Sequence, residues 1–162
     1  MLNLEGVCFR KGWLHFFHRG NITGTNVLIT LLWKDFLRFQ NGYSSFRADK
    51  IQLPAVQNIY PGISGATIIP ETNAILFTAS LERTENVIDD GPVLGSMIGV
   101  LHYSKSLLKN PETAILSTDE AIPVKLESIA IKAISGKEIT ALCVSDMDEN
   151  SSQLLEIKIL RD

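Results

Sequence analysis

A short pattern of residue types occurs three times along the chain, and this repetition limits the fold more than any other feature. Each copy places an apolar, a polar, a small and an apolar residue in succession. The copies are Leu4-Glu5-Gly6-Val7, Ile63-Ser64-Gly65-Ala66 and Leu126-Glu127-Ser128-Ile129. Their third positions lie 59 and 63 residues apart. A fixed period of this order is typical of repeat architectures, so we expect a structural unit of about 60 residues.

Apolar and polar residues alternate within each unit, which predicts antiparallel β-strands. Each copy of the pattern opens a first strand, and a second apolar run follows a short turn, at residues 13–17, 74–79 and 139–144. Third strands are expected at 26–33, 96–103 and 153–160, and fourth strands at 46–53 and 113–117. We expect no fourth strand in the third unit, because the sequence ends there. Helical periodicity is weak, and only residues 103–109 are expected to form a turn or two of helix.

Four antiparallel strands per unit are the content of a β-propeller blade. We therefore expect an all-β fold, a β-propeller fragment of about three four-stranded antiparallel blades, the C-terminal half of a six-bladed propeller. Residues 1–162 would form this single fragment, with blade 1 at about 2–54, blade 2 at about 62–118 and an incomplete blade 3 at about 124–161. An open ring would expose strand edges, so either missing blades or a second copy of the chain is expected as a partner.

Charge and hydropathy exclude several functional classes. The chain has 15 Lys and Arg residues against 18 Asp and Glu residues, which leaves no basic surplus for binding nucleic acid. Its longest apolar run, residues 27–33, is interrupted by Thr30 and is far shorter than the roughly 20 residues of a transmembrane segment. No signal peptide is apparent, which predicts a cytoplasmic protein, or a periplasmic or secreted one if N-terminal sequence is missing. Cys8 and Cys143 lie in apolar runs, which favours free core thiols over a single disulfide.

A propeller places the starts of its innermost strands and the ends of its second strands on one face of the disc. A ligand site is therefore expected at the mouth of the central channel. The candidate ligand-binding residues are Asn3, Glu5, Arg19, Ser64, Glu82, Glu127 and Asp146. Carboxylates beside an arginine can hold a small polar molecule, or a hard cation through oxygen ligands. The alternative is that these are solvated loop residues, with Glu5 and Arg19 paired within their own blade.

No cofactor is firmly implied, and a divalent cation such as calcium is the candidate. Its candidate ligands are Glu5, Asp146 and Asp148. The spacing Asp146-x-Asp148-x-Asn150 resembles the start of a calcium loop, but Ser151 replaces the turn glycine and the position of the bidentate Glu is apolar. This departure favours a hairpin turn.

Other chemistry has weaker support. Residues 82–95 form the longest loop expected between two strands, a length that favours a binding role. Ser96 does not occupy a G-x-S-x-G sequence and lies in an expected strand, which predicts a structural role. The three histidines, His15, His18 and His102, lack zinc-type spacing.

Two segments of the first unit resemble a known group of proteins. Asn3-Leu4-Glu5-Gly6 and Arg19-Gly20 resemble the N-x-E-G and R-G signatures of bacterial propellers of the phytase-like esterase group, and residues 65–96 are similar to an uncharacterised branch of it. A more distant resemblance is to gluconolactonase and regucalcin-like propellers. In that family a Glu in an E-G motif binds a divalent metal, and Glu5 matches its position, whereas the remaining ligands have no match here.

Two functions follow as expectations. The first is a propeller that binds a small ligand or partner at the channel mouth without catalysis. The alternative is a metal-assisted hydrolase of a small ester, lactone or phosphoester. In that case Glu5 would ligate the metal, Asp146 or Glu82 would act as second ligand or base, and Arg19 would bind the substrate anion.

Overall fold

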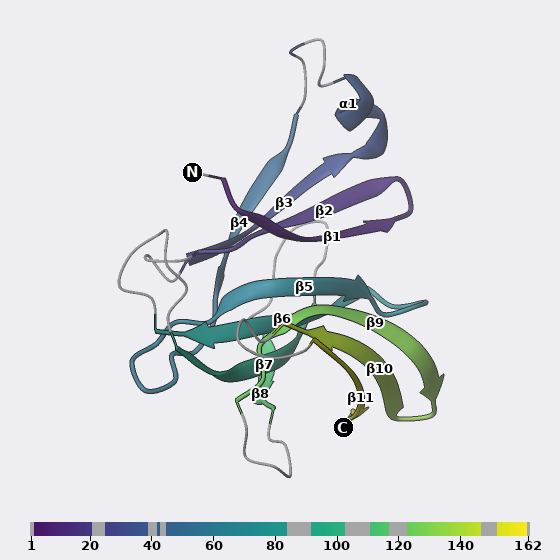
Figure 1. Cartoon of the computed structure of the whole chain (residues 1–162). Helices are drawn as coiled ribbons and strands as arrows, with labels where there is room; N and C mark the ends of the chain where they lie inside the picture. The colour runs from purple at the N-terminus through teal and green to yellow at the C-terminus, as the bar shows by residue number, and fades with distance from the viewer. Residues whose placement is uncertain are drawn as a thin grey trace.

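The computed structural model describes residues 2–20, 25–38, 42, 45–83, 92–102, 111–116, 123–146 and 152–161. These residues form eleven strands and one short helix (Figure 1). In chain order they are β1 (Leu4–Arg10), β2 (Trp13–His18), β3 (Thr25–Leu32), α1 (Trp33–Arg38), β4 (Arg47–Gln52), β5 (Gly62–Ile68), β6 (Ala74–Glu82), β7 (Val93–His102), β8 (Glu112–Ile115), β9 (Leu126–Ser135), β10 (Glu138–Ser145) and β11 (Gln153–Leu160).

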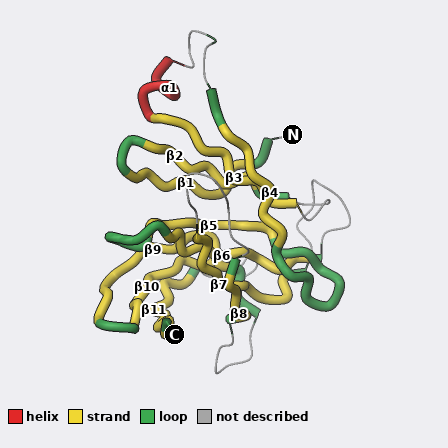
Figure 2. Tube along the Cα trace, turned by 180° about the vertical axis from the view of Figure 1, so that it is seen from behind, coloured by secondary structure: helices red, strands yellow, loops and turns green. Residues whose placement is uncertain are grey.

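The strands form three separate antiparallel sheets, which confirms the all-β prediction. The first sheet has the order β1-β2-β3-β4, the second β5-β6-β7-β8, and the third, among the described residues, β11-β10-β9. Each strand pairs with its neighbour in sequence, as expected for hairpin-connected units. The first strands lie next to one another, β1 beside β5 and β5 beside β9, and the sheets extend outward from them (Figures 1 and 2).

Most strands begin and end close to their predicted limits, and the turns explain why. Lys11 and Gly12, between β1 and β2, both have positive φ angles, 47° and 83°. Two successive positive φ values are typical of the type I′ turn, whose twist matches that of the strands it joins. The expected loop at 82–95 is shorter at both ends, because Glu82 still belongs to β6 and β7 begins at Val93.

The helix α1 was not expected. Residue 33 was predicted to end a strand, but β3 ends at Leu32 and Trp33 begins the helix. The Trp33 ring stacks on Phe36, and the two rings contact Phe9 and Phe16 of the first sheet. Packing against the sheet therefore stabilises a helix that local periodicity does not predict. The helical turn expected at 103–109 lies outside the described residues, and no described helix is long and apolar enough to cross a membrane.

Apolar side chains fill the two spaces between consecutive sheets. Between the first and second sheets, Phe17 and Leu28 pack with Ile75 and Phe77. Between the second and third sheets, the packed residues include Leu76, Leu126, Ile129, Ile139 and Ala141. Cys8 and Cys143 belong to these two cores, and both are buried free thiols as predicted. The core is thus divided between sheet interfaces, and every sheet depends on its neighbour.

Matching positions in the sheets form rows of side chains across three strands. The rows through the small residue of the repeat are Gly6–Phe17–Leu28, Gly65–Thr78–Ile98 and Ser128–Val144–Leu154. We call them forward rows, because the first two face the following sheet. A Cβ atom at Gly6 would lie 3.3 Å from the Ala66 backbone nitrogen, and one at Gly65 would lie 2.8 Å from Cα of Ser128. The small residue is therefore where the first strands of consecutive sheets meet.

A buried amide joins the first sheet to the backbone of the second. Asn26 in β3 accepts a hydrogen bond of 2.9 Å from the backbone nitrogen of Ile63 and donates one of 2.9 Å to the carbonyl oxygen of Pro61. Its Oδ1 also accepts a bond of 3.2 Å from the backbone nitrogen of Gly20, which follows β2. Asn26 therefore holds the start of β5 against the start of β3.

Ser96 makes the same kind of contact between the second and third sheets. Its Oγ accepts a hydrogen bond of 2.9 Å from the backbone nitrogen of Leu126 and donates one of 2.6 Å to the carbonyl oxygen of Val124. The prediction that Ser96 is structural is confirmed. We call Asn26 and Ser96 the clamp residues, because each binds a backbone N–H and the C=O two residues before it.

Candidate functional site

Three β-bulges occur at matching positions in the first strands. The strand pairing shifts by one residue between Leu4 and Gly6, between Ile63 and Gly65, and between the partners of Val144 and Ser145 in β9. The extra residues are Glu5, Ser64 and Glu127, the polar members of the repeated pattern. A bulge bends its strand and redirects a side chain, which makes it a common feature beside functional sites. The repeat thus presents one polar residue per sheet where the first strands begin.

An ion pair joins the first and second sheets near these bulges. Arg19 Nη2 lies 2.7 Å from Glu82 Oε1, and both side chains are largely buried, at 12% and 3% exposed. The Arg19 side chain passes over Gly62, where an added Cβ atom would lie 2.5 Å from Arg19 Nε. The absence of a side chain at Gly62 therefore allows Arg19 to reach Glu82. The observed partner of Arg19 therefore lies in the second sheet. The alternative expectation was that Arg19 pairs with Glu5 within the first unit.

Lys125 connects the same carboxylate to the third sheet. Its Nζ lies 3.7 Å from Glu82 Oε1 and 3.6 Å from Glu127 Oε1. Lys125 was not among the candidates, although it precedes Leu126 as Asn3 precedes Leu4, and Asn3 was one of them. Superposing the three units position by position would have identified it. Its ammonium group links charges from two sheets at a site that is only 7% exposed.

Glu127 is the more accessible carboxylate of this group, at 29% exposed. Burial raises its pKa, and the carboxylates of Glu5 and Glu82 add to the rise, whereas the positive charges of Lys125 and Arg19 oppose it. All four residues are therefore close enough to act on one carboxyl group. We call the five residues Glu5, Arg19, Glu82, Lys125 and Glu127 the mouth cluster. It draws on all three sheets and combines three acidic with two basic groups.

The remaining candidates lie in different surroundings. Asn3 contributes its backbone, with its N and O atoms each 2.9 Å from His18 Nδ1 and its O accepting a bond from the Arg19 backbone. Ser64 is buried and donates a hydrogen bond of 2.5 Å to the Leu126 carbonyl oxygen, which joins two sheets. Asp146 is exposed, and its carboxylate accepts a bond of 3.5 Å from Ser152.

The metal prediction stays untested. Asp148 lies outside the described residues, and the part of the chain that is described contains no group of three His, Cys, Asp or Glu side chains arranged to hold a metal ion.

Ser80 occupies the repeat position of Arg19, because it follows Ala79, the partner of Ile63 in the strand pairing. It is buried, and its Oγ has no hydrogen-bond partner among the described residues.

A comparison with protein families gives one match, over residues 1–159, to a family described as "Family of unknown function (DUF6929)". The chain belongs to the DUF6929 family. No curated protein and no solved structure matched it. Membership in DUF6929 carries no assigned activity, so any function has to be argued from the residues themselves.

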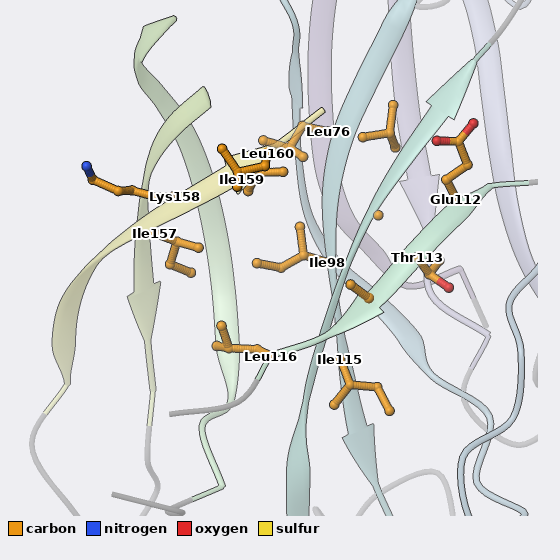
Figure 3. Close-up of a pocket in the computed structure, with 13 residues that line it drawn as sticks. Leu76, Ile98, Glu112, Thr113, Ile115, Leu116, Ile157, Lys158, Ile159 and Leu160 are labelled. Atoms are coloured by element: carbon orange, nitrogen blue, oxygen red, sulfur yellow. The ribbon is translucent and has the colours of Figure 1, made fainter. Parts of the chain in front are cut away.

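A separate feature of this DUF6929 chain is an apolar groove between the second and third sheets, with a volume of about 440 Å³. Ile98, from β7, faces Ile157 and Ile159, from β11, across it, and Leu116 lies at one end (Figure 3). Glu112 and Lys158 are the charged residues of its lining. No residue of the mouth cluster lines the groove, so the two features are separate.

Proposed function

We propose that the three sheets are consecutive blades of a β-propeller and that the mouth cluster binds a small ligand without catalysis. The adjacent first strands support the blade arrangement, because they line the channel in a propeller. The matching bulges support the site, because they place Glu5, Ser64 and Glu127 near the starts of the three adjacent first strands. The observation that carries the proposal is the partly exposed Glu127 carboxylate, which Lys125 joins to the buried Glu82.

The charges of the mouth cluster indicate the class of ligand. Three carboxylates face two cations in this cluster: Glu82 lies within ion-pair distance of both Arg19 and Lys125, and Lys125 is shared with Glu127. The more exposed Glu127, and the half-buried Glu5 at the matching bulge, then present acceptor oxygens. Carboxylates bind N–H and O–H donors through charge-assisted hydrogen bonds. The ligand is therefore a small molecule with amino or hydroxyl groups.

Binding can be tested with ethanolamine, putrescine and glucose as probes. We expect at least one probe to raise the melting temperature of the protein, and Glu127→Gln to remove this shift. Glu156→Gln is the matched control, because Glu156 is an exposed carboxylate of the same sheet that pairs with Lys132 outside the mouth cluster. A shift that survives in Glu127→Gln, or no shift with all three probes, would contradict the proposal.

The absence of catalysis is tested separately. We expect no turnover of 4-nitrophenyl acetate, a simple lactone or 4-nitrophenyl phosphate, with or without added calcium. Turnover that is lost in both Glu5→Gln and Arg19→Ala would overturn the non-catalytic assignment and favour a hydrolase. Because Arg19 also joins two sheets, circular dichroism of the Arg19 variant must first show a wild-type fold.

A further inference from the structure

The third sheet contains a residue that matches the two clamp residues. In register, Val27 lies opposite His18, Met97 opposite Ala79, and Gln153 opposite Ser145. The residues immediately before the first member of each pair are Asn26, Ser96 and Ser152. Asn26 and Ser96 are buried and bind the following sheet, whereas Ser152 is exposed. The contact described for Ser152 is a long hydrogen bond to Asp146 in its own sheet.

The first sheet contains the backbone positions that match those bound by the clamp residues. Leu4 occupies the repeat position of Ile63 and Leu126, whose backbone N–H groups are bound by the clamp residues. Ile63 and Leu126 are 0% exposed, because the preceding sheet covers them, but Leu4 is 45% exposed. Leu2, which matches the two residues whose C=O is bound, is 64% exposed. The start of β1 therefore has the sequence of a clamped strand without a sheet over it.

Further apolar residues on this side of the first sheet are also exposed, whereas their equivalents in the third unit are packed. Val7 and Phe9 are 55% and 54% exposed. Their equivalents in the third unit, Ile129 and Ile131, belong to the packed interface with the second sheet. The helix α1 lies over the Phe9 end and leaves the Leu4 and Val7 end open. We call Leu2, Leu4 and Val7 the open face of the first sheet.

The forward row of the third sheet is also uncovered. In the first two sheets its members Phe17, Leu28 and Thr78 are 0% exposed, because the next sheet packs on them. In the third sheet, Val144 is 42% and Leu154 is 69% exposed. These are apolar residues at positions where packing would be favourable, and exposed apolar groups of this kind mark interaction surfaces. We call Val144, Ser152 and Leu154 the open face of the third sheet.

We propose that two copies of this chain associate head to tail, with the open face of the third sheet of each copy packed on the open face of the first sheet of the other. Ser152 of one copy then binds the N–H of Leu4 and the C=O of Leu2 in the partner, as the clamp residues do within the chain. Two such contacts close a ring of six sheets, which lies within the range of four to eight blades known for propellers. The inference rests on the repeated packing of the sheets and is independent of ligand binding.

A second copy is the occupant that the residues specify, because one chain carries both halves of the contact. Exposed charges beside the open face of the third sheet do not oppose it, since Lys132 pairs with Glu156 and Lys158 with Glu138. Heterologous contacts that close on themselves give rings, whereas contacts that do not close give filaments. The three sheets extend outward from their adjacent first strands (Figure 1), and continuing this arrangement through a second copy favours closure.

Sedimentation equilibrium of the 162-residue chain tests the proposal. We expect a species of twice the 17.9 kDa chain mass. Val7→Glu and Leu154→Glu should each convert it to monomer, because each places a charge in both contacts of the ring. Ile115→Glu is the matched control, since Ile115 is an exposed apolar residue on β8 outside both open faces. A monomeric wild-type chain, or oligomers larger than a dimer, would overturn the inference.

Mixing the two monomeric variants distinguishes a head-to-tail dimer from a dimer formed through two copies of the same face. In a Val7→Glu and Leu154→Glu pair, one of the two contacts contains neither substitution, so we expect the mixture to associate more strongly than either variant alone. A dimer formed by two copies of the same face would be disrupted by one of the substitutions and retained with the other. That result would overturn the head-to-tail arrangement even if the wild type is a dimer. Circular dichroism confirms that each variant is folded.

Discussion

Arg19 of the first sheet and Glu82 of the second form an ion pair of 2.7 Å across the interface between the two sheets. Because Lys125 of the third sheet lies 3.7 Å from the same carboxylate oxygen, Glu82 connects all three sheets. Neither contact lies within a strand pairing. The mouth cluster is therefore both the candidate ligand site and part of what positions the sheets relative to one another.

Replacing Glu82 with Gln should destabilise the protein by about 3 kcal/mol, because breaking a buried ion pair leaves its partners without a counter-charge. Glu156→Gln removes the carboxylate of an exposed pair, in which Lys132 and Glu156 are 53% and 45% exposed, and should cost much less, because solvent screens exposed ion pairs. Urea unfolding of the two variants at one protein concentration measures the difference. Equal losses in the two variants would contradict a special role for Glu82.

Alanine at the small position of the repeat should have a different cost in each unit. Gly65→Ala places a Cβ atom 2.8 Å from Cα of Ser128 and 3.2 Å from the Glu127 carbonyl oxygen, so backbone must move, and we expect a loss of about 2 kcal/mol. Gly6→Ala, at 3.3 Å from Ala66, should cost less. Ser128→Ala should be close to neutral, because Ser128 is exposed within one chain. Chemical denaturation of the three variants gives the order, and a neutral Gly65→Ala would contradict the packing described.

The three-unit organisation could be predicted because it depends on local patterns. Strand β11 was expected at 153–160 and is Gln153–Leu160, since alternation and a bounding polar cluster define it within a few residues. The sequence pattern also placed Glu5, Ser64 and Glu127 at matching positions, which the bulges share. The strands and the matching polar positions within each unit could therefore be predicted from the sequence.

Contacts between units could not be predicted from these local patterns. Arg19 and Glu82 are 63 residues apart, and their pairing depends on the space that Gly62 leaves for the arginine side chain. Ser64 has the same repeat position as two glutamates, yet its short side chain turns inward to bind the backbone of the third sheet. The helix α1 forms because aromatic rings find a surface on another part of the first sheet. Each of these features depends on how the sheets pack, which alternation along one strand does not specify.

Asn26→Ala should be strongly destabilising, because it leaves the backbone N–H of Ile63 and the C=O of Pro61 buried without their partner. Each unsatisfied buried group costs roughly 1–3 kcal/mol, so we expect a loss of at least about 3 kcal/mol. Asn26→Asp keeps the acceptor oxygen for Ile63 and should retain more of the fold's thermal stability than the alanine variant. Thermal unfolding compares the two. A larger loss in Asn26→Asp than in Asn26→Ala would show that burying the charge outweighs the retained bond and would contradict this ranking.

The stability of the first sheet should depend on pH through His15. This side chain is 1% exposed, and its Nδ1 lies 3.2 Å from Thr30 Oγ1. Burial lowers the pKa of His15 from 6.5 to about 4, and the positive charges of Arg47 and Arg10 contribute to the decrease. The folded protein therefore keeps His15 neutral in a range where the unfolded chain binds a proton. Its contribution to stability is complete above about pH 6.5 and is lost as the pH falls toward 4.

We accordingly expect the free energy of unfolding to fall by about 2 kcal/mol more in the wild type than in His15→Gln between about pH 7 and pH 4.5. The variant lacks the titrating group, so the difference between the two proteins should narrow as the pH decreases. His102→Gln is the control, because His102 is an exposed histidine at the end of β7. Urea unfolding at a series of pH values measures the slopes. Parallel curves for wild type and His15→Gln would show that the buried imidazole does not determine the acid sensitivity of this sheet.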